Sequence, residues 1–255
     1  MRGRRCSTAP WTGNIGPGRP SSRKKAVCPL TYPKIVPGVF LERPNRFIAH
    51  VRTAGGVQVC HVKNTGRCRE LLVPGAQVYL ADCPSPSRKT RYDLVAVDKA
   101  GRLINLDSQA PNRVAAEYLP ALLPGLSLLR PETRFGASRF DFYAEAGDER
   151  WFVEVKGVTL ERDGEALFPD APTQRGTRHL RELAACLEQG YRACVLFVVQ
   201  MDGVRRFLPN QETDPAFAQA LREGAQRGVR VEAASCAVTP ESLEIQGKVP
   251  VFLGF

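Results

Sequence analysis

The stretch Ser138–Leu160, SRFDFYAEAGDERWFVEVKGVTL, decides how the second half of the chain folds. It predicts two strands joined by a hairpin turn at AGDE. Side chains two residues apart on a strand point to the same face, so Glu154 and Lys156 share one face of a strand that is otherwise apolar. Such a pair is either an exposed ion pair or part of an active site.

The segments around this hairpin predict a mixed α/β domain over residues 109–255. Apolar residues at helical spacing predict helices over residues 111–123, 173–189 and 214–228. Gly190 is expected to end the second helix, and Asp214 to cap the third. The strand segments LSLLRPETRF, ACVLFVVQ and VRVEAASCAV complete an order of helix, three strands, helix, strand, helix, strand.

The first half of the chain has a different pattern. Short alternating segments separated by Gly- and Pro-containing turns predict five strands over residues 33–108, which favours a small β-barrel such as an OB-fold. Two of its loops are basic, and their cations either contact phosphate or are simply solvated. These cations are Lys63 and Arg67 in KNTGRCR, and Arg88, Lys89 and Arg91 in SRKTR.

Charge and cysteine content narrow the class of protein. The formal charge is +10, but residues 1–41 hold eight basic side chains and no acid, so the rest of the chain is near neutral. Residues 1–32 are expected to be a disordered tail, either a nucleic-acid-binding arm or a solvated one.

No apolar run is long enough to cross a membrane, and no signal peptide is expected. The eight cysteines form no Cys-x-x-Cys, which predicts free thiols in the cytoplasm.

The hairpin brings a second carboxylate to the pair on the second strand. Asp141 lies thirteen residues before Glu154, on the opposite arm. Two converging carboxylates can hold Mg²⁺ or Mn²⁺, and a neighbouring lysine such as Lys156 can orient a water and offset developing charge. This combination indicates phosphodiester hydrolysis. Glu132, on the preceding strand, is a candidate third carboxylate for the metal.

The helix over residues 173–189 begins with positive charge. Helix N-termini favour acidic side chains, so bases there indicate a bound anion such as a phosphate group. Arg175, Arg178 and His179 are therefore candidate nucleic-acid-binding residues, with a solvated polar face as the alternative. Asp170, in the preceding loop, either caps this helix or reaches the site.

Several long segments, taken in order, resemble the sugar fermentation stimulation protein family of bacteria and archaea. They include HVKNTGRCRELLVPGAQVYL, INLDSQAPNRVAAE, SRFDFYAE, FVEVKGVTL and FPDAPTQRGTRHLREL. The resemblance implies an OB-like domain followed by a PD-(D/E)xK nuclease-like domain, with DNA as a more fitting partner than RNA. Asp141, Glu154 and Lys156 match the two acids and the lysine of that motif. Its proline is absent, because Phe140 precedes Asp141.

Three functions remain open at this point. The first is a metal-dependent nuclease that uses the motif residues. The second is a non-catalytic DNA-binding regulator of sugar-utilisation genes that uses the same groove. The third is a single-strand binder in which the barrel acts alone, although few aromatic residues lie in its loops for bases to stack on. The sequence indicates no oligomeric state.

Overall fold

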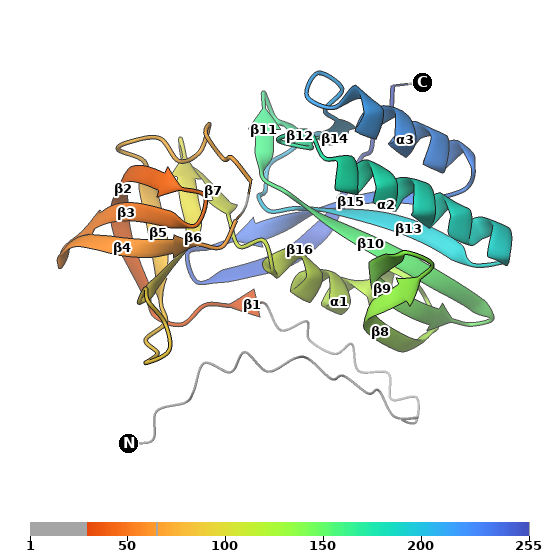
Figure 1. Ribbon diagram of the computed structural model, residues 1–255, viewed down its shortest axis with the longest axis horizontal. Helices are drawn as coiled ribbons and strands as arrows, with labels where there is room; N and C mark the ends of the chain where they lie inside the picture. Colours follow the sequence, from red (N-terminus) through yellow and green to blue (C-terminus); the bar gives the residue numbers. More distant parts are fainter. Residues whose placement is uncertain (1–29, 65, 255) are drawn as a thin grey trace.

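The computed structural model describes residues 30–64 and 66–254, which form a β-barrel and an α/β domain lying side by side (Figure 1). Of the expected tail 1–32, residues 1–29 lie outside this description and the next two form a strand. In chain order the elements are β1 (Leu30–Thr31), β2 (Ile35–Asn45), β3 (Ile48–Thr53), β4 (Gly56–Val62), β5 (Gln77–Asp82), β6 (Tyr92–Lys99), β7 (Arg102–Asn105), α1 (Ala110–Leu122), β8 (Leu126–Phe135), β9 (Ser138–Ala146), β10 (Glu149–Val158), β11 (Leu160–Arg162), β12 (Glu165–Phe168), α2 (Gln174–Ala185), a 3-10 turn (Cys186–Gln189), β13 (Arg192–Val199), β14 (Arg206–Pro209), α3 (Pro215–Gln226), β15 (Arg230–Val238) and β16 (Ser242–Val249).

The barrel has the strand order of an OB-fold. Its strands follow the order β4-β3-β2-β5-β6, and a parallel pairing between β4 and β6 closes the ring. Strand β7 pairs with β6 and leads out of the barrel. Closure leaves few unpaired strand edges, and the interior is filled by side chains such as Phe40, Val51 and Leu94. The OB-fold prediction is confirmed.

The first strand of the barrel, β2, was missed by the sequence pattern. It contains Pro37 and Pro44, which normally argue against a strand, and its pairing with β3 shifts register twice. Gly38 lies at the closest approach between the two strands, because a Cβ there would lie 2.5 Å from Val51 Cγ1. The prolines and the glycine therefore mark the bends of a closed barrel strand.

The α/β domain is built on a mixed sheet with the order β1-β16-β15-β13-β10-β9-β8. Strand β10 lies near its centre, antiparallel to β9 and parallel to β13. The predicted hairpin is confirmed, since Glu149 pairs with Ala146 across a tight turn where Gly147 takes a positive φ of 57°. The hairpin thus places the two halves of the candidate site on adjacent strands.

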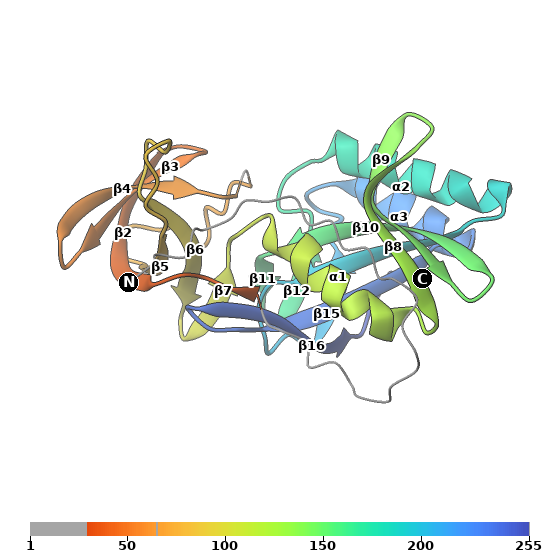
Figure 2. The same ribbon diagram turned by 90° about the horizontal axis from the view of Figure 1, so that it is seen from below.

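Helices cover both faces of this sheet (Figures 1 and 2). Helix α1 packs through Val114 and Leu119 on one face, together with Val153 from β10. Helices α2 and α3 cover the other face, and Leu180 and Phe217 pack there in the core that also holds Phe152 of β10. Successive side chains of β10 point to opposite faces of the sheet, so its apolar side chains pack in two separate cores. A sheet covered on both faces requires this arrangement.

All three predicted helices are present, and so are the cap at Asp214 and the left-handed Gly190. The sequence did not indicate the short strands β11, β12 and β14, which form a small separate sheet. Strands of three or four residues are no longer than many turns, and they are too short to show the alternating pattern of a strand in their sequence. Within residues 30–64 and 66–254, no helix is long and apolar enough to span a membrane.

Polar contacts join the barrel to the α/β domain. Glu161, at the start of the small sheet, is buried and accepts from Lys99 at 2.8 Å and pairs with Arg102 at 2.8 Å. The barrel's entry and exit also touch, because Asn105 Nδ2 donates to the Tyr32 hydroxyl at 2.9 Å. The two domains therefore meet through specific hydrogen bonds as well as through packed side chains.

Candidate active site

Asp141 lies where strands β9 and β10 separate. Their ladder runs from Glu149–Ala146 to Val153–Phe142 and stops there. One residue further, Val155 N donates to Asp141 Oδ2 at 2.7 Å, so a side chain satisfies a backbone donor that the ladder would otherwise have used. This contact fixes the Asp141 carboxylate beside the β10 backbone.

Helix α1 supplies the second partner of Asp141. Asn112, in the first turn of the helix, donates from Nδ2 to Asp141 Oδ1 at 2.7 Å. Burial, followed by the negative charge of Glu154, raises the pKa of Asp141 to about 6, although both hydrogen bonds and the charge of Lys156 act to lower it. Two buried carboxylates whose charges repel each other favour either protonation of one of them or a bound cation.

Glu154 is 3% exposed and faces α2. Its Oε1 lies 2.5 Å from Lys156 Nζ and 2.7 Å from His179 Nδ1. Its Oε2 is buried, and no hydrogen-bond donor reaches it within the described part of the chain. A buried carboxylate oxygen without a partner costs free energy, so this atom indicates a missing ligand. Glu154 and Lys156 are therefore not an exposed ion pair.

His179 is not at the surface, where a side chain that contacts nucleic acid is expected. It is 5% exposed, and its ring packs edge-on against Phe140 while Nδ1 contacts Glu154. Its role is to hold the carboxylate from the α2 side. Arg175 and Arg178 on the same helix are exposed, as expected of phosphate-binding side chains.

The N-cap of α2 is Thr173, whose Oγ1 accepts from Gly176 N at 3.0 Å. Asp170 is therefore not the cap, which corrects the simpler of its two interpretations.

Glu132 does not join the carboxylate pair of Asp141 and Glu154. Its side chain is exposed on β8 and lies 3.5 Å from Arg139, on a residue whose φ is 51°. Across residues 30–64 and 66–254, no group of three or more His, Cys, Asp or Glu side chains is placed to hold a metal.

Three of the five basic side chains predicted in the barrel loops form internal ion pairs. Lys63 donates to the buried Asp107 at 2.7 Å, Arg91 donates twice to Asp82, and Arg88 pairs with Asp93. These pairs fix the barrel loops and leave little free charge for phosphate. The remaining two cations, Arg67 and Lys89, are exposed.

Asn112 and the inward orientation of His179 were not foreseen. A sequence gives no signal for a hydrogen bond between a helix and a strand that lies 29 residues away. His179 falls on the same helical face as Gly176 and Leu183, both buried, and this spacing was the available signal for burial. Because histidine is a polar residue, it was assigned to the exposed face of the helix.

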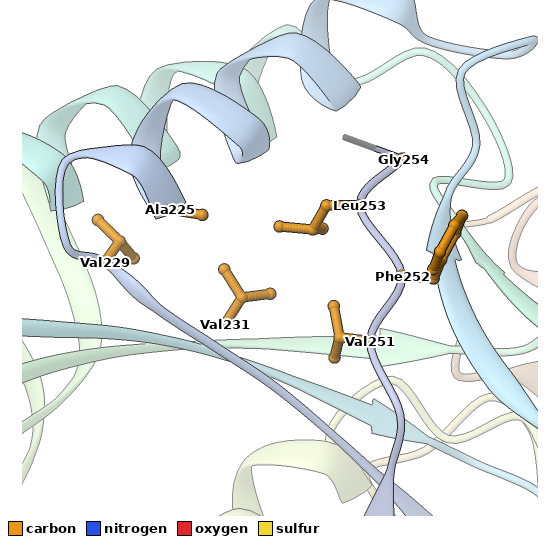
Figure 3. A pocket seen from close by; sticks show the side chains of 7 residues that line it. All are labelled: Ala225, Val229, Val231, Val251, Phe252, Leu253 and Gly254. Atoms are coloured by element: carbon orange, nitrogen blue, oxygen red, sulfur yellow. The ribbon is translucent and has the colours of Figure 1, made fainter.

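A pocket of about 360 Å³ lies away from these groups, between α3, β15 and the C-terminal segment (Figure 3). Its walls are side chains such as Val229, Val231, Val251 and Leu253. Among the described residues, no titratable side chain lines this pocket, so it has no part in the candidate site.

Comparisons with known proteins agree with the two-domain fold. Two domain models match the chain: "SfsA N-terminal OB domain" over residues 41–106, and "Sugar fermentation stimulation protein RE domain" over residues 109–242. A sugar fermentation stimulation protein homolog of Ruminiclostridium cellulolyticum is 48% identical over 88% of this chain and 100% of its own length. One from Desulfitobacterium hafniense is 51% identical over 88% of this chain and 99% of its own length.

A solved structure is similar along most of the chain. It is described as "The structure of Pyrococcus Furiosus SfsA in complex with Ca2+", and it superposes with a TM-score of 0.79 at 30% identity. The match covers 88% of this chain and 98% of that one. The likeness extends across both the barrel and the α/β domain.

Proposed function

Because the chain belongs to the sugar fermentation stimulation protein family, we propose that it binds DNA and hydrolyses phosphodiester bonds at Asp141, Glu154 and Lys156 with the help of Mg²⁺ or Mn²⁺. Membership brings an OB domain and a nuclease-like fold, both of which suit nucleic acid. The activity itself is argued from the site.

The observation that carries the proposal is the unpartnered Oε2 of Glu154 beside Asp141, whose pKa is raised. A pair of carboxylates with an orphaned oxygen fits a hard divalent cation, which prefers oxygen ligands. The Pyrococcus furiosus relative was solved in complex with Ca²⁺, which supports a divalent cation as the ligand, and the proposal places it at this pair. When bound, Mg²⁺ or Mn²⁺ would polarise a phosphoryl oxygen and lower the pKa of a water it binds.

The chain's own residues have distinct roles in this proposal. Lys156 places a positive charge 2.5 Å from Glu154, where it can orient the attacking water and offset charge that develops on the phosphate. Asn112 and His179 position the two carboxylates from opposite faces of the sheet. The exposed Arg175 and Arg178 hold the phosphate backbone at the start of α2.

The free thiols support a cytoplasmic protein. Among the described residues, Cys60, Cys68, Cys186, Cys194 and Cys236 are buried free thiols. Burial raises the pKa of Cys60 and of Cys236 to about 12. Thiols held in this form persist in a reducing compartment.

The test is cleavage of labelled DNA by the purified protein with Mg²⁺ or Mn²⁺, compared with Lys156→Ala. We expect the variant to lose about 10²–10³-fold in rate, because the charge that stabilises the transition state is removed. Lys248→Ala removes an equal charge from an exposed pair with Glu232, and we expect it to cleave as the wild type does.

Thermal melts of both variants show whether folding is retained. Cleavage by Lys156→Ala at the wild-type rate would refute the assignment of that residue. If the wild type binds DNA in EDTA but never cleaves it, the non-catalytic regulator is the correct function.

A further inference from the structure

A polar pocket of about 290 Å³ lies between the barrel and the α/β domain, next to the candidate active site. Its floor is formed by the carboxyl ends of β10 and β13, where Gly157 directly follows Lys156. Its opposite wall includes Asn64 and Gly66 from the barrel. Ligands commonly bind at the carboxyl ends of parallel strands, and this pocket lies at those ends.

Gln200 presents a fixed acceptor to this pocket although it is only 1% exposed. Its Nε2 donates to Asn105 O at 3.1 Å, Asn105 Oδ1 at 2.9 Å and Asp107 O at 3.1 Å, which settles the orientation of the amide. Its Oε1 lies beside Gly157, where a Cβ would approach it to 2.5 Å. No donor to this Oε1 is found in the described part of the chain.

Asp170 supplies a second acceptor from the loop before α2. Within residues 30–64 and 66–254, it has no hydrogen-bond or ion-pair partner, since Thr173 caps the helix in its place. Its Oδ2 lies 2.7 Å from the position that a Cβ on Gly66 would occupy, so the carboxylate lies against the barrel at the wall of the pocket. A half-buried carboxylate without a partner is costly unless a ligand completes it.

The side chains that line the pocket indicate which kind of ligand it can bind. Of the residues that the structure describes, no lysine or arginine lines the pocket, so it does not suit a phosphate group. It offers acceptors at Asp170 and Gln200, while Leu160, Phe168 and Pro172 provide apolar walls. A flat ring with hydrogen-bond donors along one edge fits such a site.

We propose that this pocket binds an unpaired guanine base of the nucleic-acid strand, with Asp170 accepting from its N1–H and N2 amino group. Guanine presents two adjacent donors on this edge. Adenine and cytosine place a ring acceptor next to their amino group, and that acceptor would face the carboxylate. Thymine and uracil have a single N–H between two carbonyl groups. The proposal rests on the proposed function, because it assumes that a nucleic-acid strand lies at Lys156.

The test compares thymine oligonucleotides that carry one guanine or one inosine at the same position, since inosine lacks only the 2-amino group. Binding is measured by fluorescence anisotropy in EDTA, which prevents cleavage. We expect the guanine oligonucleotide to bind about tenfold more tightly, as one good bidentate contact allows. Asp170→Asn should remove this preference, and Asp148→Asn, at an exposed turn, should keep it.

Equal binding of the two oligonucleotides to the wild type would overturn the inference while leaving DNA binding intact. So would a guanine preference that survives Asp170→Asn in a protein that melts as the wild type does. If no oligonucleotide binds, the proposed function fails, and calorimetry with GMP and IMP then tests the pocket alone. GMP binding that is lost in Asp170→Asn supports the guanine site, and no GMP binding by the wild type overturns it.

Discussion

Asp141 and Glu154 are held in place by groups from three different elements. Asn112 comes from α1, the Val155 amide from β10, and His179 from α2. Each partner fixes one carboxylate oxygen, and one oxygen of Glu154 has no such partner. The metal-free protein thus bears an electrostatic cost at this point, since two partly buried negative charges lie side by side.

We expect Asp141→Asn to stabilise the metal-free protein at neutral pH. The folded-state pKa of Asp141, about 6, lies above its unfolded value of 3.8, so the folded state binds the proton more tightly. Stability is then lost as pH rises through this window, by about 3 kcal/mol once the group is fully ionised. The neutral amide avoids that loss.

The measurement is chemical denaturation in EDTA at pH 4 and pH 8. The advantage of the variant should be small at pH 4 and reach its full size at pH 8. Adding Mn²⁺ should stabilise the wild type and leave Asp141→Asn unchanged. A variant less stable than the wild type at pH 8 would mean that Asp141 is mainly structural.

At this scale the sequence was informative wherever the period of a strand decided the outcome. Glu154 and Lys156 share a face because strand side chains alternate, and the hairpin turn brings Asp141 beside them. The contacts of His179 and Asn112 depend on how the helices pack on the sheet, and this packing cannot be predicted from local periodicity. Glu132 was misplaced because the chain turns through a left-handed φ at that residue, which redirects the side chain.

Helix α2 serves the site with two different faces. Its buried face carries His179 and Leu183 against the sheet, and its exposed face carries Arg175, Arg178 and Arg181. The basic start of the helix is unfavourable for an isolated helix, because the positive end of the dipole lies there. The arrangement is stabilised when an anion binds at that end.

We expect the double variant Arg175→Ala, Arg178→Ala to bind DNA more weakly without losing its fold. Each lost phosphate contact should reduce the slope of log K against log salt by about 0.7–0.9. Arg227→Ala, whose exposed side chain pairs with Glu188 beyond the other end of α2, is the matched control. Salt titrations by anisotropy provide the slopes, and an unchanged slope in the double variant would place the phosphates elsewhere.

On the scale of the whole molecule, the junction between the two domains depends on Glu161. Burial acts to raise its pKa, but hydrogen bonds from Lys99, Gly164 N and Arg102 outweigh this and lower the pKa to about 2. Its stabilising contribution is therefore complete above pH 4.5 and is lost as the pH falls towards 2.

We expect Glu161→Gln to lower the free energy of unfolding by about 2–4 kcal/mol at pH 7, because two cations lose their buried partner. The difference from the wild type should shrink as the pH falls below 4.5. Glu149→Gln breaks an exposed pair with Arg192 and should cost less than about 1 kcal/mol. Urea denaturation at several pH values provides the comparison, and equal losses in both variants would contradict a special role for the junction.

The overall architecture was predictable because both domains have strong periodic patterns. The OB-fold followed from short strands and turns, and the α/β domain from the order of its helices and strands. Of the elements that were missed, β1, β11, β12 and β14 have only two to four residues and β2 contains prolines, while β16 lies next to the edge strand β1. Their pairing depends on partners distant in sequence, such as Leu30 with Leu243, so local pattern is a poor guide to them.

The contact between Tyr32 and Asn105 has a consequence for protein engineering. The chain leaves the main sheet after β1, builds the whole barrel, and returns to within hydrogen-bonding distance of its point of departure. The barrel is therefore an insertion whose two ends already meet. A linker of a few residues in its place would close the α/β domain on itself, and another small module with adjacent termini could be grafted there without moving the carboxylates.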